Sequence, residues 1–390
     1  MSSIGRILRW VLLASTLVPV LLIGGCIVLA IGAGIENRRH DVNDRAAAAA
    51  DAGLRRPLLS TSGRVLFIAG SDTHDFYVVN VDGSGLRRLT HLATRFPSRP
   101  VVSADRTRLA VSTGGVLVVR LDRSGDMRQL DRPGGWLAWS PDGTQLASLS
   151  IDDQKRLHLN VFNSDGGGEA RDIAAAWPST AEGDEQYVHD LAWSPDGRRF
   201  AFVLDTRPHY KRFGPNHAHL YIAPSDGSGL RNVSLKDSVP AGNGLVWSPD
   251  SRRLAFAGGK GITTVDVDLK WSDIPIALNQ MRSSQQPAWS PDSQRLAWFS
   301  PDSIVTSDPS GGRQQELTRG RCRGIHPSWS DDGRRIAFVC YEDRGALFVM
   351  NADGSGLTSI HAGPEESIFS PAPYRPDYPV WLPAVAPRDQ

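Results

Sequence analysis

Three histidines and an aspartate lie close together in the sequence, within residues 205–219. His217 and His219 alternate, so both would lie on one face of a strand, where Asp205 could join them as a third metal ligand. The remaining histidine of this segment is His209. Three basic side chains of the same segment would repel a cation: Arg207, Lys211 and Arg212. We therefore predict no metal site and no resident cofactor.

The chain has 3 cysteines, at positions 26, 322 and 340, too few for a disulfide framework or a zinc ribbon. Cys322 and Cys340 flank two strands that we expect to form a hairpin about Asp332–Gly333. The symmetry of that turn pairs Cys340 with Ile325 and leaves Cys322 about three residues away, whereas a disulfide needs Cα atoms within about 7 Å. We expect two separate thiols, with a disulfide as the alternative if the loop folds back.

A set of residues that could catalyse a reaction is not evident. No Ser-His-Asp set, no paired carboxylates and no phosphate-binding loop stands out in the 390 residues. His189 and Asp190 are the adjacent pair that could hold a small ligand or move a proton. The sequence therefore favours binding over catalysis.

The composition excludes some classes of protein. Lys plus Arg is 43 and Asp plus Glu is 42, giving a net charge of +1, which argues against a nucleic-acid coat and against an acidic disordered chain. Hydrophobic residues make up 40%, enough for a large core. The 38 Gly and 26 Pro residues exceed the usual background of roughly 12% in total and indicate many turns, as in an all-β fold.

One motif recurs along the chain, Trp139-Ser-Pro-Asp-Gly143, each time followed by an apolar strand such as Arg199-Phe-Ala-Phe. Further copies begin at Trp193, Trp247, Trp289 and Trp329, with a degenerate copy at Val102. A second turn, Asp-Gly-Ser-Gly, follows at Asp82, Asp226 and Asp353. Pro presets φ, and Asp-Gly completes a tight turn, so both motifs are interpreted as hairpin turns rather than ligand sites.

These repeats predict a β-propeller. Runs such as Leu-Ala-Phe are apolar on both faces, so each four-stranded sheet must be covered on both sides, as radial stacking of sheets does. The first repeat, 64–90, lacks a first strand, and Tyr378-Pro-Val-Trp-Leu382 resembles one. We predict that residues 379–382 complete that blade and give seven blades. If either segment stays outside the ring, the count is six.

The ordered motifs resemble the repeat of TolB-like β-propellers over about residues 62–382, within a propeller domain that we place at 62–384. This resemblance implies a propeller scaffold that binds other molecules. Similar propellers occur in prolyl-oligopeptidase-type peptidases, but those need a hydrolase domain with a Gly-x-Ser-x-Gly elbow, and 30 residues after position 360 cannot supply it. The resemblance therefore favours a chain that is not an enzyme.

A membrane segment precedes the repeats. Residues 10–35 contain no charged side chain and are long enough to span a bilayer, after a short tail at 1–9 and before a polar, Ala-rich spacer at 36–61. Arginines flank the segment on both sides, so the positive-inside count is close to a tie, and a cytoplasmic tail would place the propeller outside. Two alternatives remain: lipidation at Cys26, within Leu22-Ile-Gly-Gly-Cys26, and a cleaved signal peptide.

In a propeller, the loops between strands two and three and the links between blades share one rim. These loops vary here, whereas the opposite rim carries the uniform turns, and function concentrates in variable loops on a rigid scaffold. Seven residues are predicted to ring the channel mouth on that variable rim: Arg99, Trp136, His189, Asp190, Asn243, Gln286 and His326.

We predict a non-enzymatic, membrane-tethered module that binds a protein or peptide partner there. The alternatives for the protein are a channel-mouth binder or hydrolase of sugars or lactones, and a spacer in the cell envelope. The alternative for the seven residues is that they merely solvate the channel entrance.

Overall fold

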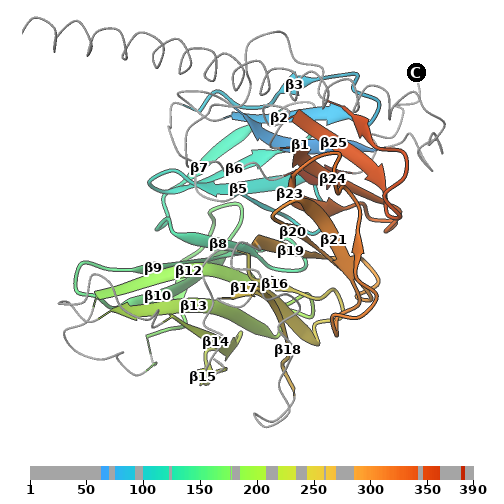
Figure 1. Cartoon of the computed structure of the whole chain (residues 1–390). Helices are drawn as coiled ribbons and strands as arrows, with labels where there is room; N and C mark the ends of the chain where they lie inside the picture. The colour runs from blue at the N-terminus through green and yellow to red at the C-terminus, as the bar shows by residue number, and fades with distance from the viewer. Residues whose placement is uncertain are drawn as a thin grey trace, which may run out of the picture. The chain divides into compact units, whose positions relative to one another are not determined.

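The computed structural model describes the chain as strands and turns. The described residues are 63–69, 75–92, 100–122, 125–175, 177, 185–207, 218–233, 244–258, 261–268, 285–340, 346–360 and 379–382. Their 27 strands form seven antiparallel sheets (Figure 1). The prediction of a seven-bladed, all-β propeller is confirmed. We number the sheets as blades 1 to 7 in chain order and give their strands from first to fourth.

Blades 1 to 4 each have four described strands. Blade 1 contains β27 (Val380–Leu382), β1 (Arg64–Ala69), β2 (Asp75–Asn80) and β3 (Arg87–Arg88). Blade 2 contains β4 (Val101–Val102), β5 (Arg108–Ser112), β6 (Val116–Arg120) and β7 (Met127–Leu130). Blade 3 contains β8 (Trp136–Trp139), β9 (Gln145–Ile151), β10 (Leu157–Asn163) and β11 (Arg171–Asp172). Blade 4 contains β12 (Glu185–Trp193), β13 (Arg199–Arg207), β14 (Ala218–Pro224) and β15 (Arg231–Asn232).

The remaining blades follow the same order. Blade 5 contains three strands among the described residues, β16 (Val246–Trp247), β17 (Arg253–Gly258) and β18 (Gly261–Asp266). Blade 6 contains β19 (Gln285–Trp289), β20 (Leu296–Ser300), β21 (Ser303–Ser307) and β22 (Gln315–Glu316). Blade 7 contains β23 (Gly324–Trp329), β24 (Arg335–Cys340), β25 (Ala346–Asn351) and β26 (Thr358–Ser359).

The C-terminal strand closes the ring as predicted. β27 pairs antiparallel with β1, with Trp381 opposite Val65 and Leu382 opposite Arg64. A hydrophobic cluster also fills every junction between neighbouring blades, including the junction of blade 7 with blade 1, where Val339 and Val349 pack with Val65. Seven sheets joined by seven shared cores form a closed ring, in which each blade is covered on both faces by its two neighbours.

The repeated tryptophans link neighbouring blades. In four blades the indole N–H donates to a carbonyl of the preceding blade's first strand: Trp139 to Val101, Trp247 to Ala192, Trp329 to Ala288 and Trp381 to Ser328. A guanidinium at or just before the start of the preceding blade's second strand lies 4.6–5.4 Å from the same ring: Arg108, Arg199, Arg295 and Arg335, respectively. The Trp and Arg positions of the repeat therefore serve blade packing.

The uniform turns are structural. In six blades the serine after the Trp position donates its hydroxyl to the turn aspartate at 2.5–2.6 Å, as Ser140 does to Asp142. In the Asp-Gly-Ser-Gly turns, the aspartate accepts the backbone N–H two residues on, as Asp226 does from Ser228 at 2.8 Å. Each carboxylate thus accepts a backbone N–H group of its own turn, in the place of a backbone carbonyl.

Blades 3 and 4 are longer than the others at their variable-rim ends. Three of the second strands, β1, β17 and β24, have 6 residues, whereas β9 has 7 and β13 has 9. Three additional residues extend a strand by roughly 10 Å. Figure 1 shows β9, β10, β12 and β13 side by side, and their side chains share one core cluster. Within the described residues, these two blades therefore have the strands that extend furthest toward the variable rim.

Several predictions concern residues outside this description. The tail at 1–9, the segment at 10–35 with Cys26, and the spacer at 36–61 all lie outside the described residues. Among the residues that the structure describes, no helix has the length and apolar character that a membrane span needs.

Candidate binding surface on the variable rim

Partly exposed apolar side chains gather at the rim ends of blades 3 and 4. Eight partly buried apolar side chains pack against the shared cluster of these blades, more than at any other blade junction within the described residues, and four of the eight lie toward the variable rim. Tyr187 at the rim end of β12 is 44% exposed. We define the rim ridge as the members of this group on the variable-rim side of their strands, Trp136, Ile151, Leu157 and Val188, together with Tyr187. Tyr187 lies on the opposite face of β12 from Val188, toward blade 5.

Trp136 is fixed across the junction of blades 3 and 4. Its Nε1 donates to the carbonyl of Val188 at 2.8 Å, which joins the start of β8 to β12. The ring is half-buried against the shared cluster. The structure therefore brings Trp136 next to the strand that carries His189 and holds its indole in one orientation.

His189 faces Asp205 and is not paired with its sequence neighbour Asp190. The His189 Nε2 lies 3.9 Å from Oδ2 of Asp205; the imidazole is 30% exposed and the carboxylate is buried. A bulge between His189 and Leu191 shifts the strand register, so that Tyr187 stands opposite Asp205. His189 lies two residues from Tyr187 and shares its face. Without the bulge, Asp205 would lie on the opposite face.

Asp190 is the residue in that bulge, and its role in the structure is to join blades 4 and 5. Its φ is 61°, in a region that Asp tolerates better than most residues. The side chain is buried, and Oδ2 accepts the backbone N–H groups of Gly244 and Leu245 at 2.5 and 2.7 Å. This carboxylate holds the start of blade 5 in place.

The other predicted mouth residues are spread around the ring. His326 occupies a second bulge, in β23 of blade 7, with φ 53°. Gln286 lies in β19 of blade 6, and its side chain is outside the described residues, as are Arg99 and Asn243. Within the described part of the chain, the structure brings together Trp136 and the β12 residues and does not bring His326 to them.

The histidine segment does not form a three-ligand site in the described residues. His219 pairs with Leu204 in the β13–β14 ladder, whereas Asp205 pairs with Ala218, so His219 and Asp205 lie on opposite faces. His219 packs instead edge-on against Tyr221, with ring centroids 6.4 Å apart. Within the described ranges, no group of three or more His, Cys, Asp or Glu side chains is placed to hold a metal ion. His209 and His217 lie outside them.

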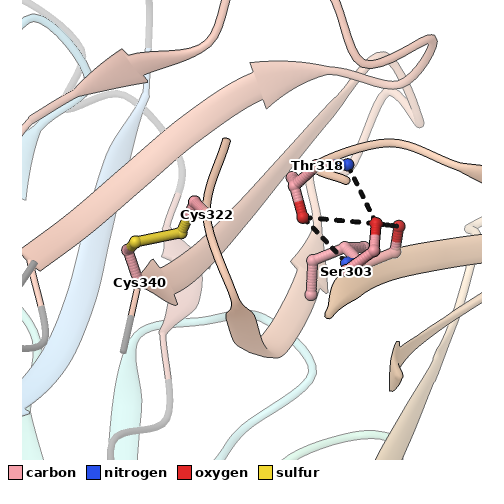
Figure 2. The surroundings of a disulfide bond; sticks show 5 residues. Ser303, Thr318, Cys322 and Cys340 are labelled. Carbon is pink, nitrogen blue, oxygen red and sulfur yellow. Dashed lines mark hydrogen bonds between the residues drawn. A yellow bond between two sulfur atoms is a disulfide. The ribbon is translucent and has the colours of Figure 1, made fainter. Parts of the chain in front are cut away.

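Cys322 and Cys340 form a disulfide, where the sequence favoured two separate thiols. Their Cα atoms are 5.7 Å apart and the S–S distance is 2.12 Å (Figure 2). The bulge at His326 places Gly324, rather than Ile325, opposite Cys340, which brings the chain before β23 one residue nearer. The loop then folds back, with the Cys322 and Arg321 N–H groups both donating to the Thr318 carbonyl.

Thr318 also ties this loop to blade 6. Its N–H donates to the Ser303 hydroxyl at 3.0 Å, and its own hydroxyl accepts the N–H of Ile304 at 2.9 Å (Figure 2). The disulfide therefore joins β24 to a loop that Thr318 already ties to blade 6, and both cysteines are buried.

Comparison with known proteins supports the fold through similar solved structures. Neither a protein-family description nor a curated protein sequence matches the chain. Among solved structures, it is similar to an oligogalacturonate lyase from Vibrio parahaemolyticus, with 14% identity, TM-score 0.54 and coverage of 74% of this chain and 86% of that one. It is also similar to a putative 6-phosphogluconolactonase from Bacteroides fragilis, with 14% identity, TM-score 0.51 and coverage of 84% and 99%.

A third similar structure is TolB from Acinetobacter baumannii, with 14% identity, TM-score 0.44 and coverage of 82% of this chain and 67% of that one. The fold that the resemblance to TolB-like propellers implied is confirmed by the closed ring of repeated, four-stranded sheets.

The prediction that the chain is not an enzyme is wrong. It rested on the lack of a hydrolase domain and of an evident catalytic set. Solved propellers of similar fold include proteins named as a lyase and as a putative lactonase. A propeller without a second domain is therefore compatible with an enzyme, and the fold alone does not decide the activity.

Proposed function

We propose that this chain is a membrane-tethered propeller that binds a protein or peptide partner on the rim ridge of blades 3 and 4, on the extracytoplasmic side. The observation that carries the proposal is the set of partly exposed apolar side chains toward the variable rim on blades 3 and 4, whose described strands are the longest, with Trp136 held by its hydrogen bond to Val188. Aromatic side chains held in place are favourable anchors for a partner, because little entropy is lost when they bind.

Two features support the tether and its side. Residues 10–35 form an uncharged apolar run long enough for a membrane helix. The Cys322–Cys340 disulfide favours an oxidising compartment, because cytosolic thiols are normally kept reduced. The disulfide therefore supports the extracytoplasmic side. The arginines that flank the apolar run are nearly equal in number on its two sides and do not decide the orientation.

Crosslinking with the full chain in its membrane tests the binding surface. A Tyr187→Ala variant should lose the crosslinked partner, because the phenol is the most exposed apolar group of the ridge. Removal of a central aromatic anchor typically weakens an interface by about 2 kcal/mol, or roughly thirtyfold. The measured quantity is the amount of crosslinked partner relative to the amount of chain.

Met127 provides the matched control. Among the described residues it is the other exposed large hydrophobic residue, 48% exposed, and it lies in β7 on blade 2. A Met127→Ala variant should keep the partner. Equal loss in both variants, or retention in Tyr187→Ala, would remove the ridge as the binding surface.

A second candidate function is favoured by the His189–Asp205 pair. A half-buried imidazole backed by a buried carboxylate can bind a hydroxyl group or transfer a proton. The corresponding test measures depolymerisation of oligogalacturonate and hydrolysis of 6-phosphogluconolactone by the full chain. Turnover that His189→Gln abolishes would support a small-molecule activity at the channel mouth. Turnover unchanged in that variant, or absent from the parent chain, would argue against it.

A further inference from the structure

A histidine on the variable rim is held between two carboxylates. The Nδ1 of His158 lies 2.7 Å from Oδ2 of Asp172, and its Nε2 lies 3.1 Å from Oδ2 of Asp152. All three side chains are about a quarter exposed, at 25–28%. His158 belongs to β10, Asp172 to β11, and Asp152 to the loop between β9 and β10. The imidazole therefore connects three successive parts of blade 3.

Both hydrogen bonds require the imidazolium. A carboxylate accepts only, so each ring nitrogen must carry a proton to bond both partners. A neutral imidazole keeps one N–H and turns a lone pair toward the second carboxylate. The bond to Asp152 is the longer of the two, so we expect loss of the proton to break that bond and leave the bond to Asp172.

Asp152 organises the loop that would move. Its Oδ1 accepts the N–H of Arg156 at 2.8 Å, and its Oδ2 accepts the Arg156 Nε at 2.9 Å. Asp172 is fixed in the sheet by the N–H groups of Leu159 and Ala174, at 3.1 and 3.0 Å. The charged groups that face His158 are therefore Asp152 and Arg156 on the loop and Asp172 on the sheet. The imidazolium of His158 therefore fastens the loop to the sheet.

We propose that His158 is a proton-controlled fastener: its protonated form ties Asp152 of the loop at residues 152–156 to Asp172 of the sheet, and its neutral form removes that tie. The backbone bonds between Asp152 and Arg156 and from Lys155 to Asp152 then hold the turn alone. Ile151 and Leu157, two members of the rim ridge, flank the loop directly. The proton would thus set the mobility of one side of the ridge. This device stands on the geometry of blade 3 and does not depend on the identity of any partner.

The pH dependence of the loop follows from the protonated and neutral states of His158. The bonds to Asp172 and then to Asp152 raise the pKa of His158 above its usual value. The fastening is complete below the ordinary histidine pKa of about 6.5 and is lost as the pH rises through the higher value of the closed loop. For each unit by which closing the loop raises the pKa of His158, protonation of His158 shifts the ratio of closed to open loop by about tenfold.

Hydrogen exchange of the full chain in detergent, followed by mass spectrometry between pH 5.5 and 9, tests the proposal. After correction for the intrinsic exchange rate, protection of amides 152–156 should fall about fivefold or more as the pH rises. In His158→Gln, protection should be low and independent of pH. In Asp152→Asn, which keeps the imidazole, most of the pH dependence should also disappear. His91→Gln, a change at an exposed histidine, should behave as the parent chain.

Protection that is independent of pH in the parent chain would overturn the proposal, as would a pH dependence that survives in His158→Gln. Exchange in the β13–β14 ladder of each variant reports whether the propeller is folded. If His158→Gln fails to fold, Asp152→Asn alone decides between a fastener and a purely structural bond.

Discussion

A methyl group at Gly227 would collide with the neighbouring blade. An added Cβ would lie 2.7 Å from the carbonyl oxygen of Ile173, at a φ of +81° that disfavours other residues. We predict that Gly227→Ala lowers the free energy of unfolding by about 2 kcal/mol or more, from the clash and the backbone strain together. Urea unfolding of the full chain in detergent measures the change.

The same turn contains the control. A Cβ at Gly229 would meet nothing within 4 Å, and this glycine has no positive φ. Gly229→Ala should therefore stay within about 0.5 kcal/mol of the parent. A Gly227→Ala variant as stable as Gly229→Ala would show that the contact between blades 3 and 4 is looser than described.

The turn aspartates make the fold sensitive to acid. The hydroxyl of Ser140 and then the N–H of Thr144 lower the pKa of Asp142. The stabilisation is present above the unfolded pKa of about 3.9 and is lost as the pH falls through the lower folded value. In Ser140→Ala, we predict that the carboxyl titration of Asp142, followed by NMR, moves toward higher pH. Asp308, which is bound by Ser310 in blade 6, should keep its titration.

At the scale of the blades, two departures from the repeat form a matched pair. Arg106 stands where most copies have Gly or Ser, and Asp331 stands where four copies have Pro. The Arg106 guanidinium from blade 2 bonds the carbonyl of Trp381 in β27 and lies 2.5 Å from Oδ1 of Asp331 in blade 7. One side chain therefore connects three blades at the point where the ring closes.

Restoring the repeat at this position should weaken the protein. Arg106→Gly relieves a φ of 56°, a gain of about 1 kcal/mol, but loses a charged hydrogen bond of about 1.5–3 kcal/mol. The ion pair adds little, because Asp331 is 56% exposed. We predict a net loss of about 1 kcal/mol, measured by urea unfolding. Arg334→Ala, at an exposed position nearby, should change stability by less than about 0.5 kcal/mol. A more stable Arg106→Gly chain would contradict the role in closure.

The blades also show what the sequence could and could not predict. Trp139 and its copies, together with Trp381 near the C-terminus, marked the strands and the closure of the ring, because the same physical contact recurs in blade after blade. The bulges at Asp190 and His326 could not be predicted, because one extra residue leaves the pattern of apolar residues almost unchanged. Each bulge moves the partner strand by one residue, which reverses the faces. The His189–Asp205 contact was missed for this reason, and the disulfide, expected only as an alternative, depends on the bulge at His326 together with the folded-back loop.

The whole ring determines which surfaces can act. The uniform rim is occupied by turns whose carboxylates bind their own backbone, and the blade junctions are filled by the Trp and Arg side chains. Within the described residues, partly exposed apolar side chains are most numerous at the junction of blades 3 and 4, whose strands outgrow the repeat, while Met127 is exposed on blade 2. Because the scaffold is closed and rigid, a partner bound there would meet a surface that needs little ordering, which favours affinity.

The proposed placement of the propeller outside the cytoplasm can be tested through the disulfide. In intact cells treated with acid and then alkylated under denaturing conditions, a Cys26→Ser chain should take up no maleimide-polymer tag without prior reduction and 2 tags after it, because Cys322 and Cys340 would be its remaining cysteines. A Cys322→Ser, Cys26→Ser chain should take up one tag under both conditions. Two tags without reduction would mean that the cysteines stay reduced in the cell, which would argue for a cytoplasmic propeller.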